Sequence, residues 1–247
     1  MRHLVDMLNN LLSDKNMPPG DRLIFALDVP TFAEARRFVD ILDDTVNFYK
    51  IGLELFMSGN YFDLLDWLAG KKNKKVFVDL KFFDVPETVK SAVRQLSGKG
   101  ITFATVHGNE GMLRAAVENK GDLKILAVTL LTSLDQKDME DLGFSVDVRQ
   151  LVLSRARRAL AIGCDGVISS GIEAPELRAE LGEKFIIVTP GIRPVLNVDD
   201  QKRTVDVEQA FLAGADYIVV GRPIKNAPVP WRAAQDIQAR INKLFSR

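Results

Sequence analysis

Short apolar runs of β-branched and aromatic residues alternate along the chain with amphipathic stretches of helical period. The strand-like runs cover residues 23–29, 46–52, 75–81, 101–107, 123–130, 165–170, 184–191 and 215–221. The helix-like stretches cover residues 32–42, 61–69, 87–98, 111–119, 148–162, 175–181, 206–213 and 230–244. This alternation predicts parallel strands joined by crossover helices. An open doubly wound sheet shares the pattern, but the regular repetition over this length favours a single closed (β/α)8 barrel, the TIM barrel fold.

The segment before the first predicted strand has a different pattern. Leucines and a methionine at positions 4, 7, 8, 11 and 12 recur at helical spacing, and Asp6 and Asp14 interrupt the apolar residues. A signal peptide has a continuous apolar core, which this segment lacks. We expect residues 1–22 to form a short helical N-terminal extension that packs against a catalytic barrel domain of residues 23–247.

Composition narrows the possible partners and the compartment. The 247 residues include 33 basic and 33 acidic ones, so no overall charge favours nucleic acid or an anionic membrane surface. No uncharged apolar run approaches the roughly 20 residues of a membrane span. Cys164 is the single cysteine, which excludes an intramolecular disulfide and fits the reducing environment of the cytoplasm.

Polar side chains stand where the predicted strands end. In an eightfold α/β barrel the carboxyl ends of the strands carry the active site. We leave His107 out of the catalytic set, because a single histidine at such a position is more often a hydrogen-bonded scaffold residue. The polar residues at or just beyond these ends, which we expect to face one mouth, are Asp28, Lys50, Asp79, Lys81, His107, Thr132, Arg193 and Arg222.

The third predicted strand carries the densest charge cluster, with Asp79, Lys81 and Asp84 in a DxKxxD pattern. Side chains two residues apart share one face of a strand, so Asp79 and Lys81 point the same way, beside Lys50 on the neighbouring strand. A lone Asp-x-Lys pair is commonly only an exposed salt bridge. In a confined barrel mouth, however, alternating ammonium and carboxylate groups keep one another ionised. The cluster then forms a rigid charge array.

The chemistry of such an array is narrowed by the motifs that the sequence lacks. It has no histidine-rich metal constellation, no Ser/His/Asp set, no GxGxxG fingerprint and no Walker P-loop. An ionised Lys81 remains as a group that can protonate a carbanion and stabilise it electrostatically. Asp79 beside it would repel a substrate carboxylate, and this repulsion would be relieved when the carboxylate departs.

The last two predicted strands end in VTPGIRP and VVGRPI, at the place where barrels commonly bind phosphate. Gly191 and Gly221 let backbone amides approach an anion, while Arg193 and Arg222 supply forked charged donors. Either segment alone could be a structural turn, but the two at adjacent strand ends predict a phosphorylated small-molecule ligand. The polar stretch after Arg193 is typical of a loop that closes over a ligand, and Gln201 could reach the phosphate from it.

Seven segments carry a family resemblance: ALDVP, KIGLELF, VFVDLKFFDVPETV, TVHG, AVTLLTS, VTPGIRP and ADYIVVGRPI. Through their order and spacing, from about Leu23 to the C-terminus, the chain resembles the orotidine 5'-phosphate decarboxylases. These lyases convert orotidine 5'-monophosphate to uridine 5'-monophosphate in de novo pyrimidine biosynthesis. The resemblance implies a homodimer that uses neither a metal nor an organic cofactor.

The resemblance also implies roles for particular residues. Lys81 would donate a proton to C6 of the pyrimidine, within an array that also contains Lys50, Asp79 and Asp84. Asp84 and Thr88 would be contributed by the partner subunit. The other implied substrate contacts are Asp28 and Lys50 at the ribose hydroxyls, Thr132 at the pyrimidine, and Arg193, Gln201, Gly221 and Arg222 at the phosphate.

The match has local departures. The family often shows DLKFHDIPNT where this chain has DLKFFDVPET. The differing residues are Phe83, Val85 and Glu87, while the charged residues of the DxKxxD pattern remain. Glu87 places an unexpected carboxylate beside the residues assigned to the partner subunit.

Other functions stay open on the sequence. A sugar-phosphate decarboxylase related to 3-keto-gulonate 6-phosphate decarboxylase also carries DxKxxD, but those magnesium enzymes typically have an acidic residue where Lys50 stands, since Mg²⁺ prefers carboxylate ligands. A Schiff-base aldolase would need an uncharged Lys81 or Lys50, which the flanking aspartates disfavour. A non-catalytic nucleotide-binding barrel would need the phosphate loops but not the alternating charges.

Overall fold

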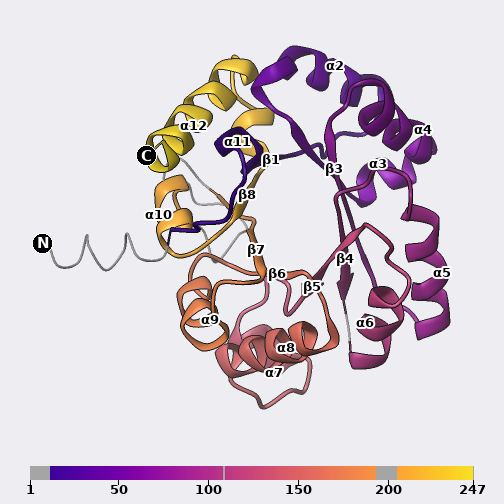
Figure 1. Cartoon of the computed structure of the whole chain (residues 1–247), viewed down its shortest axis with the longest axis vertical. Helices are drawn as coiled ribbons and strands as arrows, with labels where there is room; N and C mark the ends of the chain where they lie inside the picture. Colours follow the sequence, from indigo (N-terminus) through magenta and orange to yellow (C-terminus); the bar gives the residue numbers. More distant parts are fainter. Residues whose placement is uncertain (1–11, 108, 193–204, 247) are drawn as a thin grey trace, which may run out of the picture.

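The computed structural model describes residues 12–107, 109–192 and 205–246, which form a closed barrel of parallel strands surrounded by helices (Figure 1). Each strand pairs with the next one in sequence, and the last pairs with the first, which excludes the open doubly wound sheet. The predicted (β/α)8 barrel is therefore confirmed. The strands are β1 (Leu23–Ala26), β2 (Phe48–Ile51), β3 (Lys75–Phe82), β4 (Phe103–His107), β5 (Lys124–Val128), β6 (Gly166–Ile168), β7 (Ile186–Thr189) and β8 (Tyr217–Val220).

Helices form a ring outside the strands (Figure 1). The α-helices are α2 (Phe32–Leu42), α3 (Leu53–Met57), α4 (Tyr61–Asp66), α5 (Pro86–Leu96), α6 (Glu110–Val117), α7 (Gln136–Asp141), α8 (Val148–Ile162), α9 (Ala174–Leu181), α10 (Val207–Leu212), α11 (Arg222–Lys225) and α12 (Pro230–Phe245). Shorter turns are the 3-10 helices η1 (Pro19–Asp21) and η2 (Asp43–Thr45) and the π-helical turn η3 (Trp67–Lys71), which continues α4. The predicted helices of the barrel all occur, and the ends of α2 and α8 match the expected residues.

Local sequence explains why the longer helices begin and end where they do. The side chain of Thr31 accepts a hydrogen bond from the amide of Glu34 at 3.2 Å and so caps the start of α2. The side chain of Asp147 caps α8 in the same way, and α8 ends at Gly163 in the left-handed conformation, with φ 105°. The apolar face of each helix then packs on the barrel.

Alternate strand residues point inward and outward, and this alternation sets the floor of the barrel mouth. Four inward aromatic rings, from Phe48, Phe77, Phe103 and Tyr217, pack against one another with centroid distances of 5.1–5.9 Å. The next inward position on each of β2, β3 and β4 is polar, which places Lys50, Asp79 and Thr105 in a layer directly above the rings. The apolar floor keeps bulk water away from the underside of this layer.

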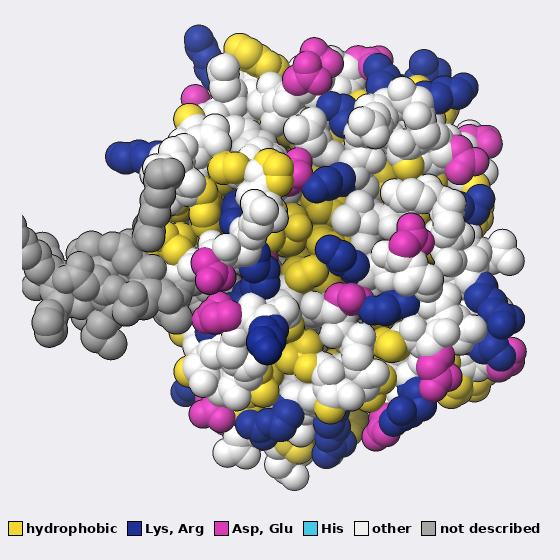
Figure 2. Space-filling model, viewed as in Figure 1, with side chains coloured by type: hydrophobic (Ala, Val, Ile, Leu, Met, Phe, Trp, Pro, Cys, Tyr) yellow, Lys and Arg dark blue, Asp and Glu magenta, His cyan; other side chains and the backbone are white. Residues whose placement is uncertain are grey.

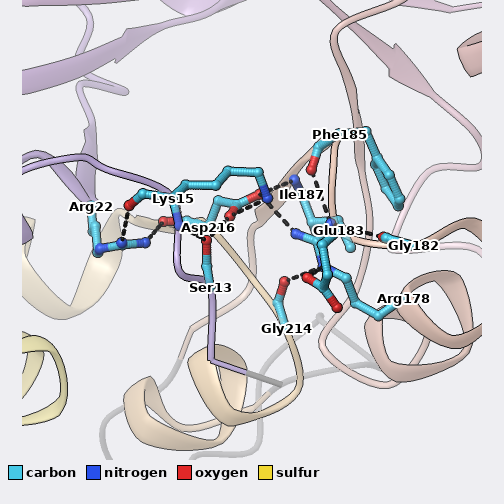
Figure 3. Close-up of polar contacts among 10 residues, drawn as sticks. All are labelled: Ser13, Lys15, Arg22, Arg178, Gly182, Glu183, Phe185, Ile187, Gly214 and Asp216. Atoms are coloured by element: carbon cyan, nitrogen blue, oxygen red, sulfur yellow. Dashed lines mark hydrogen bonds and ion pairs between the residues drawn. The ribbon is translucent and has the colours of Figure 1, made fainter. Parts of the chain in front are cut away.

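A network of buried charges joins the opposite, amino-terminal ends of β1, β7 and β8 (Figure 3). Asp216, which is fully buried, accepts hydrogen bonds from Ser13 at 2.5 Å, Lys15 at 3.0 Å and Arg178 at 2.8 Å. Arg22 donates to the backbone oxygen of Asp216 at 3.2 Å and lies 3.8 Å from the centroid of the C-terminal ring of Phe245. Residues 13–22 are thereby tied to the barrel by charge-assisted hydrogen bonds.

The apolar positions 4–12 that predict an N-terminal helix lie almost entirely outside the described part of the chain, so that helix stays a prediction; within the described part of the extension, residues 13–18 form no helix and Pro19–Asp21 form the 3-10 turn η1. Over the face shown in Figure 2, acidic and basic side chains are interspersed, so this face carries no extended patch of one sign. Within the described residues, no helix has the length and apolar character needed to span a membrane.

Candidate active site

A cavity of about 240 Å³ opens at the carboxyl ends of the strands. Among the described residues, its charged lining comprises Asp28, Lys50, Asp79, Lys81 and Arg222. Its apolar lining includes Phe77, Val128, Leu130, Leu131, Ile168 and Val219. Thr132, Gly191 and Gly221 complete the set of sequence-predicted residues that the barrel brings to this cavity.

Four charged side chains alternate in sign along one wall of the cavity. Lys50 Nζ lies 3.0 Å from Asp28 Oδ1 and 3.4 Å from Asp79 Oδ2. Lys81 Nζ lies 2.9 Å from Asp79 Oδ1. The order Asp28, Lys50, Asp79, Lys81 therefore runs across β1, β2 and β3, and the carboxylate of Asp79 is shared by both ammonium groups. The alternating array expected at the barrel mouth is present, with Asp28 rather than Asp84 as its second carboxylate within one chain.

The array holds its buried members in their charged forms. Burial by itself would raise the pKa of Asp79, but the charges of Lys50 and Lys81 and the hydrogen bonds to its carboxylate lower that pKa below the ordinary value. Burial would also lower the pKa of Lys50, yet attraction to Asp79 and Asp28 raises it above the ordinary value. The negative charge of Asp79 is thus kept beside the space that a ligand would occupy.

Lys81 reaches this position through an unusual backbone conformation. Its φ is 49°, in the left-handed region, where a residue other than glycine costs about 1–2 kcal/mol. The conformation occurs where the pairing of β3 with β4 becomes irregular, between Val78 and Phe82. Such strained, non-glycine positions cluster at functional sites, where the surrounding structure holds them in place. The strain supports a functional role for Lys81.

Two glycines support the shape of the site, since Gly191 lines the cavity and Gly52 lies against the ion pair of Lys50 and Asp28. A Cβ atom on Gly52 would lie 3.2 Å from Lys50 Nζ and 3.4 Å from Asp28 Oδ1, against the ion pair itself. Gly191 has a φ of 78°, a conformation that glycine adopts without the steric cost of a side chain. Gly52 was not among the predicted site residues, although its place in the KIG segment after β2 could have indicated it.

The opposite part of the cavity is built from the ends of β7 and β8. Gly221 precedes the short helix α11, whose first residue is Arg222, and both line the cavity. Barrels frequently bind phosphate at the N-terminus of a short extra helix after the eighth strand. Lys225, at the end of α11, donates a hydrogen bond to the backbone oxygen of Asp28 at 2.7 Å and so joins this side to β1. Arg193 and Gln201 lie outside the described residues.

Asp84 and Thr88 do not line the cavity formed by their own chain. Both side chains are exposed, in the loop after β3 and the first turn of α5. Asp84 Oδ1 accepts a hydrogen bond from the amide of Val85 at 2.7 Å. Within the described residues, no group of three or more His, Cys, Asp and Glu side chains is placed to bind a metal ion.

Comparison with known proteins assigns this barrel to a family. Residues 21–237 match the "Orotidine 5'-phosphate decarboxylase / HUMPS family". The chain belongs to this family. Among its relatives, the orotidine 5'-phosphate decarboxylase of Methylococcus capsulatus is 63% identical over 239 residues, which cover 96% of this chain and 98% of that protein. The enzyme of the same name from Xanthomonas axonopodis pv. citri is 54% identical, over 90% of this chain and 92% of that protein.

A solved structure supports the same assignment. The crystal structure of orotidine 5'-phosphate decarboxylase from Lactobacillus acidophilus superposes with a TM-score of 0.79 at 34% identity. The superposition covers 90% of this chain and 99% of that one. The barrel and the order of its strands are therefore those of the orotidine 5'-phosphate decarboxylase family.

Two of the three residues that depart from the family pattern have local structural partners. The ring of Phe83 packs edge-to-face against His107, with centroids 5.1 Å apart. Glu87 forms an ion pair with Lys90 at 3.0 Å, one helical turn along α5.

His107 Nδ1 is buried without a hydrogen-bond partner among the described residues, so the expected hydrogen-bonded scaffold role is not seen at that atom. Burial, together with the charges of Arg155 and Lys81, lowers the pKa of His107.

Thr105 is the main residue of the charge array that the sequence did not predict. Its side chain is fully buried and contacts both Asp79 and Lys81. The signal that could have found it is positional, because Thr105 stands two residues after the inward-facing Phe103, as Asp79 stands two residues after Phe77. A threonine inside an apolar strand was less conspicuous than a charged residue.

Proposed function

We propose that this chain decarboxylates orotidine 5'-monophosphate to uridine 5'-monophosphate, the step of de novo pyrimidine biosynthesis that its family and the names of its relatives indicate. The observation that carries the proposal is the array in which Asp79 lies between Lys50 and Lys81, at 3.4 and 2.9 Å, in a cavity that also contains Arg222. The catalytic unit is the barrel of residues 23–247.

The array accounts for both halves of the reaction. The negative charge of Asp79 disfavours a substrate carboxylate placed against it, and this repulsion disappears when CO2 leaves. The electron pair of the broken C6–carboxylate bond stays on C6, which becomes carbanion-like. The ammonium of Lys81 stabilises that charge and then donates its proton to C6. The residues of the chain supply all of these groups, so the proposed reaction needs no metal and no organic cofactor.

The rest of the cavity orients the nucleotide. Asp28 and Lys50 lie where they can hold the ribose hydroxyls, and Thr132 contacts the pyrimidine. The phosphate lies at the end of β8, against Gly221 and the guanidinium of Arg222, whose forked donors suit phosphate oxygens. Arg193 and Gln201, outside the described residues, are proposed to complete the phosphate site.

We further propose that the working enzyme is a cytoplasmic homodimer in which Asp84 and Thr88 complete the partner's cavity. Both residues are exposed and do not line the cavity of their own chain, as expected of residues that enter the cavity of a partner subunit. Large exposed apolar side chains come from the same region, the segments after β2 and β3. They are Leu53, Phe56, Met57, Phe62, Phe83 and Val85.

An ultraviolet assay that follows loss of the orotate chromophore tests the function directly. We expect turnover of orotidine 5'-monophosphate by the purified chain, with the same rate before and after treatment with a chelator. Absence of turnover would exclude the proposal, and turnover that disappears with the chelator would exclude its metal-free form.

Three alternative functions are distinguished from decarboxylation of orotidine 5'-monophosphate, two of them by experiments on the same preparation and the third by the residue at position 50. A Schiff-base aldolase would be inactivated by borohydride in the presence of substrate, with Lys81 or Lys50 trapped. A non-catalytic nucleotide-binding barrel would bind uridine 5'-monophosphate without turnover. A magnesium-dependent sugar-phosphate decarboxylase is disfavoured by Lys50, whose ammonium stands where such an enzyme would need a metal ligand.

A further inference from the structure

Thr105 occupies a central place beneath the charge array. It lies on β4 with its side chain fully buried, on the same inward face as Phe103. Its hydroxyl donates a hydrogen bond to Asp79 Oδ1 at 2.9 Å and accepts one from the backbone amide of Lys81 at 2.9 Å. One oxygen atom thus contacts the carboxylate of Asp79 and the backbone of Lys81 at once.

This arrangement compensates for the irregular pairing of β3 with β4. Between two matched pairs, Val78 with Ala104 and Phe82 with Val106, β3 advances four residues while β4 advances two. Extra residues of this kind lose regular backbone partners in the neighbouring strand. The amide of Lys81 instead donates to the side chain of Thr105. The hydroxyl therefore anchors the residue whose φ is 49°.

The direction of both hydrogen bonds is determined by chemistry. A hydroxyl has one hydrogen to donate, and an ionised carboxylate can only accept. Because the amide of Lys81 must be the donor in its bond, the hydrogen of Thr105 is available for Asp79. Threonine is branched at Cβ, which restricts its χ1 angle and holds the oxygen in one place. The link is directional and stiff.

We propose that Thr105 is a positioning residue for decarboxylation, because its hydroxyl joins the backbone of Lys81 to the carboxylate of Asp79 and holds proton donor and repelling charge in one geometry. This inference rests on the proposed function of the same cavity. Thr105 acts through its two neighbours and contacts no reacting atom. Displacement of catalytic groups by about 1 Å can cost about 100-fold in rate.

Two conservative substitutions separate the hydroxyl from the packing of the side chain. Thr105→Val keeps the branched shape and removes the hydroxyl, whereas Thr105→Ser keeps the hydroxyl and removes a methyl group. If the hydroxyl positions the array, kcat falls about 100-fold in the valine variant and stays within about threefold of wild type in the serine variant. If Thr105 only fills space in the core, the order reverses, because valine preserves the volume and serine leaves a void.

Binding and pH dependence give readouts that a purely structural role would leave unchanged. We expect uridine 5'-monophosphate to bind Thr105→Val within about threefold of wild type by calorimetry, so that the loss lies in kcat. Among the described residues, the titratable groups that face Asp79 are Lys50 from β2, Lys81 from its own strand and the phenol of Tyr61 from α4. Removal of the Thr105 hydrogen bond makes the carboxylate easier to protonate, so the acid limb of kcat moves to higher pH by about one unit in the valine variant only.

The hydrogen bond from the Lys81 amide to the Thr105 hydroxyl can be tested without an activity assay. In protein labelled with ¹⁵N-lysine, the amide of Lys81 should exchange slowly in wild type and Thr105→Ser and at least about tenfold faster in Thr105→Val. Melting curves by circular dichroism identify a variant that has lost its fold. If the valine variant does not fold, the comparison of the serine variant with wild type remains, and serine must then stay within about threefold of wild type in kcat.

The outcomes distinguish this inference from the proposed function. Active wild-type enzyme with equal kcat in the valine variant, or with serine as impaired as valine, would overturn the role of Thr105 and leave the function intact. Unchanged exchange of the Lys81 amide in the valine variant would overturn it as well. Wild-type protein without decarboxylase activity would overturn the function, and the positioning role in this reaction with it.

Discussion

The ammonium of Lys81 lies 2.9 Å from Oδ1 of Asp79, a residue only two positions earlier on the same strand. The pair depends on a left-handed backbone at Lys81, and Lys50 occupies the other oxygen of the same carboxylate at 3.4 Å. One buried carboxylate therefore orients two ammonium groups.

Removal of the Lys81 ammonium should abolish turnover while leaving ligand binding in place. Lys81→Ala deletes the proton donor and the positive charge beside C6, and we expect kcat to fall about 10,000-fold or more. Calorimetry should still detect binding of uridine 5'-monophosphate. Lys184→Ala, at an exposed position before β7, is the matched control and should retain full activity. Substantial turnover by Lys81→Ala would exclude Lys81 as the proton donor.

The rate should depend little on pH around neutrality as far as Asp79 and Lys50 are concerned. The pKa of Asp79 is lowered. Its negative charge, and the rate acceleration that depends on this charge, is therefore fully present above the ordinary pKa of about 3.9 and is lost as pH falls through the lower pKa of the folded protein. The pKa of Lys50 is raised. Its positive charge, and the rate acceleration that depends on this charge, is therefore fully present below the ordinary pKa of about 10.4 and is lost as pH rises through the higher pKa of the folded protein. We expect neither group to produce a limb in kcat between about pH 5 and pH 9.

A pH–rate profile at saturating substrate checks this expectation. In Lys50→Ala, the pKa of Asp79 should rise because one of its two cationic neighbours is gone, so the acid limb of the residual activity should move to higher pH. A wild-type limb near neutral pH that moves in Lys50→Ala would contradict the assignment of a fully ionised Asp79.

Loss of the Arg222 guanidinium should mainly weaken binding. A hydrogen bond to a charged group contributes about 1.5–3 kcal/mol, so Arg222→Ala should raise KM by about 10- to 150-fold with a smaller change in kcat. Steady-state kinetics measures both parameters. Arg232→Ala, on the exposed side of α12, removes the same charge away from the cavity and should have no effect. An unchanged KM in Arg222→Ala would place the phosphate elsewhere.

Two inactive variants should restore activity when mixed, if Asp84 serves the partner's cavity. In a hybrid of Lys81→Ala with Asp84→Ala, one site carries both substitutions and the other carries neither. Random exchange of equal amounts leaves about one quarter of all sites intact, so up to about one quarter of wild-type activity should return. Exchange is verified by mass spectrometry of differently tagged subunits. Verified hybrids without activity would contradict the shared site.

The charge network at the amino-terminal ends of the strands should matter for stability and not for chemistry. Asp216→Ala would leave Lys15 and the buried Arg178 without their shared carboxylate, and breaking such a buried pair costs about 3–5 kcal/mol. Chemical denaturation measures the change. Asp236→Ala, on the exposed face of α12, should stay within about 0.5 kcal/mol of wild type. The kcat of the folded Asp216→Ala protein should be unchanged, because Asp216 directly precedes the first residue of β8, whereas the cavity is lined by residues at the carboxyl ends of the strands.

Much of the fold and of the site followed from local patterns. Every predicted strand and long helix occurs, because periods of two and 3.6 residues and the capping residues are properties of short segments. Helices α3, α7 and α11 were missed; each is a short additional helix of four to six residues between a predicted strand and the predicted helix that follows it. The predicted residues that meet at the cavity are Asp28, Lys50, Asp79, Lys81, Thr132, Gly191, Gly221 and Arg222.

Other features depend on contacts between distant segments. The role of Thr105 arises only where the irregular pairing of β3 with β4 brings its hydroxyl to the amide of Lys81. The network around Asp216 joins residues separated by about 200 positions, from Ser13 to the start of β8. Alternation along β4 could have placed Thr105 on the inward face, but nothing in the sequence indicates the hydrogen-bond partners of Thr105 or of Asp216.

The order of residues along the chain was therefore sufficient for the barrel, for the strand-end charges and for the family. Alternation along a strand already determines which side chains face inward, and closure of a parallel barrel gathers its carboxyl ends at one mouth. Folding decided that Asp79 is shared by two lysines, that Lys81 is held by Thr105, and that Asp84 lies outside its own cavity. These relationships depend on how neighbouring strands pair and on where a loop leaves the barrel, and such contacts form only in three dimensions.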